Sequence, residues 1–241
     1  MTIRAVVFDI YGTLLEVGPA PPDADARWQR LCHDLLHIHK PLSRLSFSVT
    51  SSQVIARHHQ AARARGIAWP EVHWPSVVAE VLPELAQLPP HDQEEFLFRQ
   101  IQTNHTTHMA AETAAMLRWL KDRQCLLGTA SNAQSYTLRE LNEALKAHPL
   151  ALDLFDRDLC FLSFEHGFSK PDLHVFQILT ARLATRGIHP AEVLMVGDHL
   201  DNDVEPAKVH GWQTWQLGSP ADGDWSGLRE TLREPQPKAS P

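Results

Sequence analysis

Residues 5–14 read AlaValValPheAspIleTyrGlyThrLeu, and this stretch decides how the chain folds. Four apolar residues precede Asp9, and Gly12 follows three positions after it. A short apolar run that ends at a polar residue and a glycine is typical of a buried strand leading into a loop. We therefore predict a strand over residues 3–9 with Asp9 at its carboxyl end.

The same pattern recurs along the chain and predicts the fold class. Three further apolar segments each end next to a polar residue. Four other segments, which alternate with the strand-like ones, have apolar residues at helical spacing. The strand-like segments are residues 125–130, 158–162 and 193–197, and the helical ones are residues 111–122, 136–146, 173–186 and 201–209. This alternation predicts an α/β fold with a doubly wound parallel sheet, whose ligands bind at the carboxyl ends of the strands.

One region has no strand-like segment and predicts a separate module. Between about residues 23 and 105 the chain shows only helical patterns interrupted by prolines and Gly66. The predicted helices cover residues 26–39, 50–65, 74–85 and 92–102. We predict an inserted all-α cap domain over residues 18–107, with hinges at 18–22 and 104–108. The core then comprises residues 1–17 and 108–233, and the proline-rich residues 234–241 form a disordered tail.

Composition limits the partners of the protein. The net charge of −7 and the absence of a Lys/Arg run argue against nucleic acid. No apolar run approaches the ~18–20 residues that span a bilayer, and the start does not resemble a secretion signal. The three cysteines form no CxxC pair, which argues against zinc and disulfides. We expect a cytoplasmic protein with a small-molecule substrate; both a monomer and a homodimer are open.

Asp9 is the first candidate for chemistry. It follows a buried strand, and the backbone N–H groups of Gly12 and Thr13 are placed to hold an anion beside it. By itself the same pattern also fits an acidic residue that only caps a turn. Ser131 with Asn132 could likewise cap a helix, and Lys170 could be a surface residue at a helix start.

These residues occur in an order that resembles the haloacid dehalogenase superfamily of aspartate-nucleophile hydrolases. PheAspIleTyrGlyThrLeu at 8–14 resembles its first motif, and ThrAlaSerAsnAla at 129–133 its second. HisGlyPheSerLysProAsp at 166–172 is similar to the third, and MetValGlyAspHisLeuAspAsnAspVal at 195–204 to the fourth. The resemblance implies a Rossmann-like core and a small helical cap, like that of the dehalogenases and phosphoglycolate phosphatases.

The resemblance implies a role for each matching residue. Asp9 is then the nucleophile, and the Ser131 hydroxyl hydrogen-bonds an oxygen of the substrate, with Asn132 beside it. Lys170 neutralises negative charge on the nucleophile and the substrate. Asp198 binds Mg²⁺ together with Asp9 and the backbone carbonyl at position 11, and Asp203 orients the site. Gly12, Thr13 and Asn132 are further candidate substrate-binding residues.

Tyr11 departs from the phosphatase pattern. Phosphatases of the superfamily carry a second Asp there, which acts as general acid and base. A phenol with a pKa of ~10 is a poor base near neutrality. Tyrosine is what the L-2-haloacid dehalogenases carry, but their fourth motif resembles SerXaaAsnXaaXaaAsp, whereas this chain has Gly197-Asp198. We keep Tyr11 as a catalytic candidate, and its carbonyl as a Mg²⁺ ligand.

Three functions follow from this mixture of motifs. The first is a Mg²⁺-dependent phosphohydrolase for a small phosphorylated metabolite with a good leaving group. The second is a 2-haloacid dehalogenase-type hydrolase of carbon–halogen bonds, which needs no metal. The third is a ligand-binding homologue with weak catalysis. The dehalogenases' cap arginine has no clear match, and Arg27, Arg44 and Arg57 are candidates for it.

Overall fold

The core of the protein is a five-stranded parallel sheet covered by helices on both faces. A computed structural model describes residues 2–233, so the predicted tail at 234–241 lies outside the described residues. The strand order is β5-β4-β1-β6-β7. The strands are β1 (Ala5–Phe8), β4 (Leu126–Ser131), β5 (Cys160–Leu162), β6 (Val193–Gly197) and β7 (Gln213–Gln216). The predicted α/β class with a parallel sheet is confirmed.

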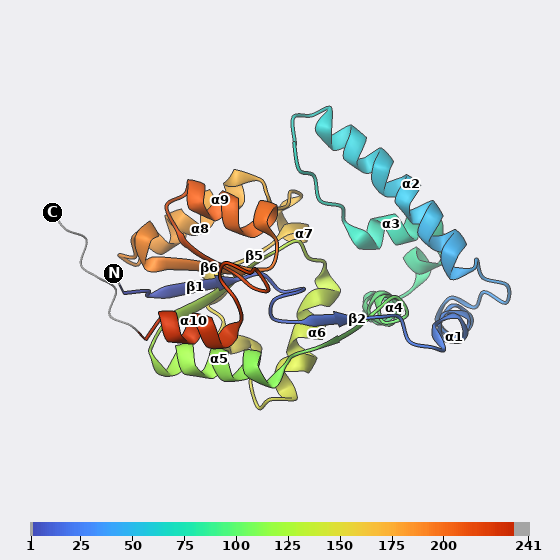
Figure 1. Cartoon of the computed structure of the whole chain (residues 1–241). Helices are drawn as coiled ribbons and strands as arrows, with labels where there is room; N and C mark the ends of the chain where they lie inside the picture. The colour runs from blue at the N-terminus through green and yellow to red at the C-terminus, as the bar shows by residue number, and fades with distance from the viewer. Residues whose placement is uncertain (1, 234–241) are drawn as a thin grey trace.

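Helices enclose two apolar layers on this sheet. The core helices are α5 (Ala111–Asp122), α6 (Ser135–Lys146), α7 (Ser163–His166), α8 (Leu173–Ala184), α9 (Glu205–Val209) and α10 (Trp225–Thr231). Val6 and Phe8 of β1 pack toward the layer formed with α5, α6 and α10, and Ala5 and Val7 toward the layer formed with α8 and α9 (Figure 1). All four β1 side chains are buried, which explains the unbroken apolar run before Asp9.

A helical module is inserted between two short strands (Figure 1). The strands β2 (Glu16–Gly18) and β3 (Thr106–His108) pair antiparallel and form a ribbon that leads the chain out of the core and back. Between them lie α1 (Ala24–Leu36), α2 (Arg44–Arg63), α3 (Trp74–Val81), the 3₁₀ helix η1 (Pro83–Gln87) and α4 (Pro90–Ile101). The module has its own apolar core around Trp28, Phe47 and Phe96. We call it the cap.

Several elements differ from the sequence predictions. Helix α2 begins at Arg44, six residues before the predicted start, because the Ser43 hydroxyl accepts a hydrogen bond from Ser46 N at 3.0 Å and caps the helix. The predicted helix over residues 201–209 is a π-helical turn, Leu200–Val204, followed by α9. The strands β2, β3 and β7 and helix α10 were not predicted. The two ribbon strands have three residues each, and β7 is a sheet edge whose sequence, GlnThrTrpGln, has no apolar run.

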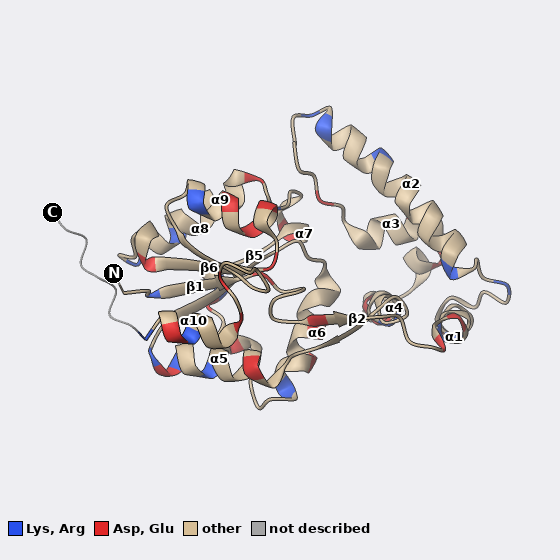
Figure 2. Ribbon diagram, viewed as in Figure 1, with Lys and Arg blue, Asp and Glu red and all other residues tan. Residues whose placement is uncertain are grey.

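Figure 2 marks the positions of the charged residues along the ribbon. Lys and Arg are interspersed with Asp and Glu over the core helices there. None of the helices within residues 2–233 combines the length and apolarity needed to cross a membrane.

Candidate active site

The polar residues predicted from the strand ends meet at one edge of the sheet. Phe8 pairs with Thr129 of β4 on one side and with Val196 of β6 on the other. Asp9, Ser131 and Asp198 therefore leave the carboxyl ends of three adjacent strands. The ends of adjacent parallel strands lie side by side, so this edge concentrates chemistry supplied by residues far apart in sequence.

Lys170 lies between two buried aspartates. Its Nζ donates to Asp9 Oδ1 at 2.8 Å and also to Asp203 Oδ1. The side chains of Lys170 and Asp203 are 2% and 1% exposed, and that of Asp9 is 10% exposed. Charges buried this deeply are tolerated only when paired and hydrogen-bonded, so each member of the triad depends on the others.

Burial and charge shift the ionisation of these groups in opposing directions. Burial alone would lower the pKa of Lys170, but the carboxylates of Asp9 and Asp203 outweigh it and raise that pKa. Burial raises the pKa of Asp203, and Lys170 opposes this. Burial also raises the pKa of Asp198, with a further contribution from Asp9. The lysine is therefore charged at neutral pH, while the carboxylates are crowded.

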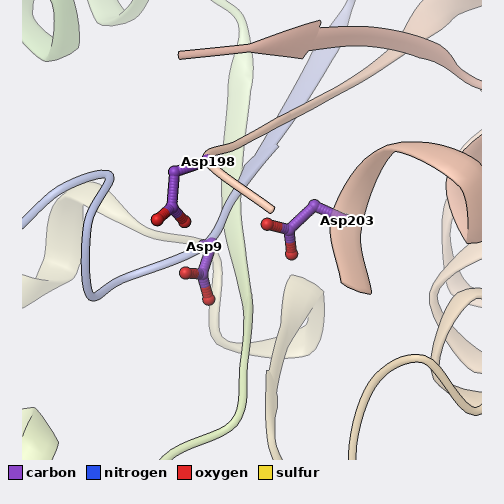
Figure 3. Close-up of side chains that lie close together, drawn as sticks. All are labelled: Asp9, Asp198 and Asp203. Carbon is purple, nitrogen blue, oxygen red and sulfur yellow. The ribbon is translucent and has the colours of Figure 1, made fainter. Parts of the chain in front are cut away.

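Three carboxylates, those of Asp9, Asp198 and Asp203, converge at this edge of the sheet (Figure 3). Asp9, Asp198 and Asp203 can each offer an oxygen such that these atoms lie within 4.8 Å of one another. One ammonium cannot balance three carboxylates, and Asp198 Oδ1 is buried without a hydrogen-bond partner. Clustered carboxylate oxygens suit Mg²⁺, so the residues present fit this cation.

The hydrogen bonds indicate which carboxylates are available to a cation. Asp203 Oδ1 accepts from Lys170, and Asp203 Oδ2 accepts from His199 N at 3.1 Å. Both Asp203 oxygens are thus engaged in holding the site together. Asp9 Oδ2 and the Asp198 carboxylate are less engaged. This division matches the predicted roles, Asp9 and Asp198 as ligands and Asp203 as an orienting residue, which remain predictions.

Gly12 lets the loop after β1 pass closely beside Asp198. Its φ is +77°, and a Cβ built there would lie 2.4 Å from Asp198 Oδ2. Gly12 N donates to Leu15 O at 2.8 Å and Thr13 N to Ile10 O at 3.3 Å, so both amides are used within the turn. The Thr13 hydroxyl is buried and has no partner. Of these two predicted substrate-binding residues, Thr13 therefore offers a free polar atom through its side chain.

We expect Gly12→Ala to lower turnover strongly because its methyl group displaces the Asp198 carboxylate. The matched control is Gly187→Ala, where φ is +66° and a Cβ meets nothing within 4 Å. Both variants should lose about 1–2 kcal/mol of unfolding free energy from backbone strain. Steady-state kinetics and urea unfolding of both proteins measure the difference. Equal turnover in the two variants would contradict a role for this close approach.

Ser131 and Asn132 have different surroundings although they are adjacent. Ser131 is 1% exposed and its Oγ has no hydrogen-bond partner, so it can donate to a substrate oxygen. Asn132 is turned to the protein: its Nδ2 donates to Lys170 O at 3.0 Å, and its Oδ1 accepts from Lys170 N at 2.8 Å. Both polar atoms of the Asn132 side chain therefore hold the backbone of Lys170.

The Tyr11 phenol is held by helix α6. It donates to Glu140 Oε2 and lies 3.0 Å from Thr137 Oγ1. Burial first, and then the charge of Glu140, raise the pKa of Tyr11 far above its ordinary value. A phenol that stays protonated and is bonded to α6 is poorly suited to act as a general base.

Residues of the cap also bond to the core near the site, and sequence reasoning missed them. Glu71 Oε2 accepts from Ser163 Oγ at 2.6 Å, and Glu71 N donates to Gly167 O at 3.0 Å. Trp69 O accepts from Ser169 N at 2.9 Å, next to Lys170. These contacts fasten the segment between α2 and α3 to the loop that carries Lys170. No short-range sequence pattern signals contacts across this separation.

The three arginines considered as cap candidates pair within the cap instead. Arg27, Arg44 and Arg57 form ion pairs with Asp23, Asp25 and Glu80, respectively. The contacts of the described residues therefore give no indication that any of them reaches the acidic cluster.

Comparison with known proteins identifies the family to which the chain belongs. The family model described as haloacid dehalogenase-like hydrolase matches residues 3–211, and the chain belongs to this family of hydrolases. Sequence comparison with curated proteins gives no match.

Solved structures of both chemical types share the fold. A HAD phosphatase from Thermococcus onnurineus is 23% identical with a TM-score of 0.55, covering 96% of this chain and 98% of that chain. An L-2-haloacid dehalogenase, RSc1362, is 18% identical with a TM-score of 0.52, covering 97% and 100%. The putative HAD-hydrolase YfnB from Bacillus subtilis, bound to magnesium, is 18% identical with a TM-score of 0.54, covering 97% and 100%. At these identities the likeness shows the fold alone.

Mg²⁺ should stabilise the protein by relieving repulsion among the three carboxylates. At a hundred times its Kd, a ligand that binds only the folded state adds about 2.7 kcal/mol. For a chain of this size that corresponds to a rise in Tm of roughly 5–10 °C. Thermal unfolding with Mg²⁺ and with EDTA measures it. Asp198→Asn should lose the rise and Asp201→Asn, an exposed neighbour in the same motif, should keep it; a rise retained in Asp198→Asn would contradict the assignment.

In EDTA the stability should depend on pH through Asp198. Because burial raises its pKa in the folded state, the folded protein binds this proton more tightly than the unfolded chain. The stabilisation is complete below the unfolded pKa of about 3.9 and is lost as pH rises through the folded pKa. Urea unfolding at several pH values should therefore show wild type losing stability relative to Asp198→Asn as pH rises. Parallel curves would count against this.

Proposed function

We propose that the protein is a Mg²⁺-dependent phosphohydrolase that uses Asp9 as its nucleophile and acts on a small phosphorylated metabolite with a good leaving group. The observation that carries this proposal is the Asp198 carboxylate beside Asp9, a third acid that one buried lysine leaves uncompensated. A divalent cation balances this charge, and a phosphoryl group brings oxygens that the cation and Lys170 both attract.

Each residue has a task in the proposed reaction. The free Asp9 oxygen attacks phosphorus opposite the leaving group and forms an aspartyl phosphate. Lys170 holds the other Asp9 oxygen in place, and the unpartnered Ser131 hydroxyl donates to a phosphoryl oxygen. When bound between Asp9, the Tyr11 carbonyl and Asp198, Mg²⁺ supplies positive charge that offsets the charge on the phosphoryl oxygens. Water then attacks phosphorus, the bond between phosphorus and the Asp9 oxygen breaks, and inorganic phosphate departs with the protons of the water, which restores the Asp9 carboxylate.

The leaving group follows from Tyr11. An alkoxide must be protonated as it departs, and loss of a positioned acid typically costs ~10²–10⁴ in rate. The Tyr11 phenol is committed to Glu140 and Thr137. The carboxylate of an acyl phosphate, or the second phosphate of a phosphoanhydride, leaves as a stable anion without that proton. We therefore favour such substrates over simple alkyl phosphate esters.

A 2-haloacid dehalogenase activity is the second candidate, and Tyr11 is the observation that favours it. Asp9 would displace halide from carbon to form an ester, and halide needs no proton on leaving. The substrate's own carboxylate would have to approach Asp9, Asp198 and Asp203 with Lys170 as the nearest described cation. Three carboxylates repel it without Mg²⁺, which makes this the weaker candidate.

A substrate panel with Mg²⁺ and with EDTA separates the candidates. Acetyl phosphate, para-nitrophenyl phosphate, an alkyl phosphate and 2-chloropropionate are each tested in both conditions. The proposal expects phosphate release from the first two only, and only with Mg²⁺. Chloride release that persists in EDTA would establish the dehalogenase instead. Mg²⁺ binding without any release would indicate a ligand-binding homologue with weak catalysis.

A further inference from the structure

The return strand of the cap is anchored to core helix α6 by one buried carboxylate. His105, directly before β3, places Nε2 3.0 Å from Glu140 Oε1. The Glu140 side chain is 3% exposed and that of His105 is 19% exposed. Both residues border a cavity of about 360 Å³ between the ribbon and α6. The ribbon is therefore bonded to the core at the point where the chain returns from the cap.

The other oxygen of the same carboxylate holds the nucleophile loop. Glu140 Oε2 accepts from the phenol of Tyr11, two residues after Asp9. The rings of Tyr11 and His105 also meet edge to face, with centroids 5.9 Å apart. A continuous chain of contacts thus runs from the hinge ribbon through Glu140 to the loop of the nucleophile.

Burial of Glu140 makes the series of contacts from His105 to Tyr11 resistant to change. When a buried carboxylate oxygen loses its hydrogen bond, the desolvation of that oxygen is no longer compensated. The arrangement in which Glu140 keeps both partners is therefore favoured. Motion of the ribbon must therefore either break the bond from His105 or carry Glu140 along with it. In the second case Tyr11 follows.

We propose that Glu140 is a positioning residue that couples the hinge ribbon of the cap, through His105, to the loop of Asp9, through Tyr11. The coupling deepens the proposed function, since its effect on turnover rests on Asp9 being the nucleophile. The structural coupling itself, between residues 9–15 and residues 106–108, is measured without any substrate. We call it the mechanical part of the proposal.

Amide hydrogen exchange of the full chain tests the mechanical part. His105→Leu removes the bond at the ribbon, and His105 lies far in sequence from β1, which ends at Phe8. We expect the exchange rate to rise about tenfold in residues 106–108 and also in residues 9–15. A rise of this size corresponds to the stability lost when a hydrogen bond to a charged group is removed. His105→Gln retains a donor and should restore both segments to within about threefold of wild type.

Two further variants control for general damage. Glu143→Gln alters an exposed carboxylate three residues further along the same helix and should leave both segments unchanged. Glu140→Gln keeps the shape and one acceptor, and should raise exchange in both segments by less than His105→Leu raises it. A rise confined to residues 106–108 in His105→Leu would overturn the coupling.

Turnover of para-nitrophenyl phosphate with Mg²⁺ gives a second readout. Misplacing the nucleophile should lower kcat about tenfold in His105→Leu while KM changes by less than about twofold, because Lys170 and Ser131 are untouched. A rise in KM with kcat unchanged would contradict positioning of Asp9. If wild type releases no phosphate, the proposed function fails, while the exchange result still decides the coupling.

Discussion

Asp9→Asn is expected to abolish turnover, with a fall in kcat on the order of 10⁴–10⁶, the range seen when an enzyme loses its covalent nucleophile. The neutral amide oxygen lacks the negative charge of a carboxylate and is a far weaker nucleophile towards phosphorus or carbon. The fold should be kept, because Lys170 still pairs with Asp203 and the change removes one of three crowded carboxylates. Kinetics with the preferred substrate measure the first effect, and thermal unfolding in EDTA the second.

The control for this variant is Asp201→Asn, which changes an exposed aspartate in the loop that carries Asp198 and Asp203. It should keep its turnover within about threefold, as exposed surface changes usually do. Asp9→Asn should unfold at the same temperature as wild type or above it, because removing repulsive functional charges commonly stabilises proteins. Substantial turnover by Asp9→Asn would reject the nucleophile assignment.

Lys170→Met has the second large expected effect, and it acts on both activity and stability. The variant leaves Asp9 and Asp203 buried beside Asp198 without their cation. Removing one partner of a buried ion pair typically costs about 3–5 kcal/mol. Turnover should fall at least about 10³-fold, because the substrate then meets uncompensated carboxylates. Urea unfolding near pH 7 and steady-state kinetics measure the two losses.

Mg²⁺ and a surface lysine provide the controls for Lys170→Met. Mg²⁺ should recover part of the stability lost in the variant, because it supplies positive charge to the same carboxylates. Lys208→Met, which removes an exposed lysine paired with Glu205, should cost less than about 1 kcal/mol. Equal stability losses in the two variants would show that the buried triad contributes no more than a surface pair.

The strands that position the site could be predicted because burial on both faces leaves a clear sequence pattern. Val6 and Val7 point to opposite sides of the sheet and are both fully buried, so the run before Asp9 is continuously apolar. The motif order then suggested that Asp9, Lys170, Asp198 and Asp203 belong to one site. The ion pairs of Lys170 with Asp9 and Asp203 place three of them side by side, and the Asp198 carboxylate lies next to the same two aspartates.

Other parts could not be predicted because their stability comes from tertiary contacts. The π-helical turn at Leu200–Val204 follows from Asp203 Oδ2 accepting from His199 N, a local bond with no periodic signature. Strand β7 forms because β6 offers it a partner, and not because its own sequence favours it.

A polar contact of Glu140 could have been predicted from the sequence pattern of α6. It lies between Thr137 and Ala144 on α6, at helical spacing beside the buried stripe that includes Leu141. A glutamate at the edge of such a stripe needs a partner, which predicts a polar contact there. The identity of that partner, Tyr11, was not accessible, because the two residues are 129 positions apart in sequence.

Trapping the covalent intermediate tests the central claim most directly. The enzyme is mixed with acetyl phosphate and Mg²⁺, quenched in acid within the first turnover, and digested for mass spectrometry. We predict that the peptide containing Asp9 gains the mass of one phosphoryl group, and that Asp9→Asn gains none. A phosphoryl group on another residue would contradict the account. Release of phosphate in the first turnover while the Asp9 peptide stays unmodified at every quench time would contradict it as well.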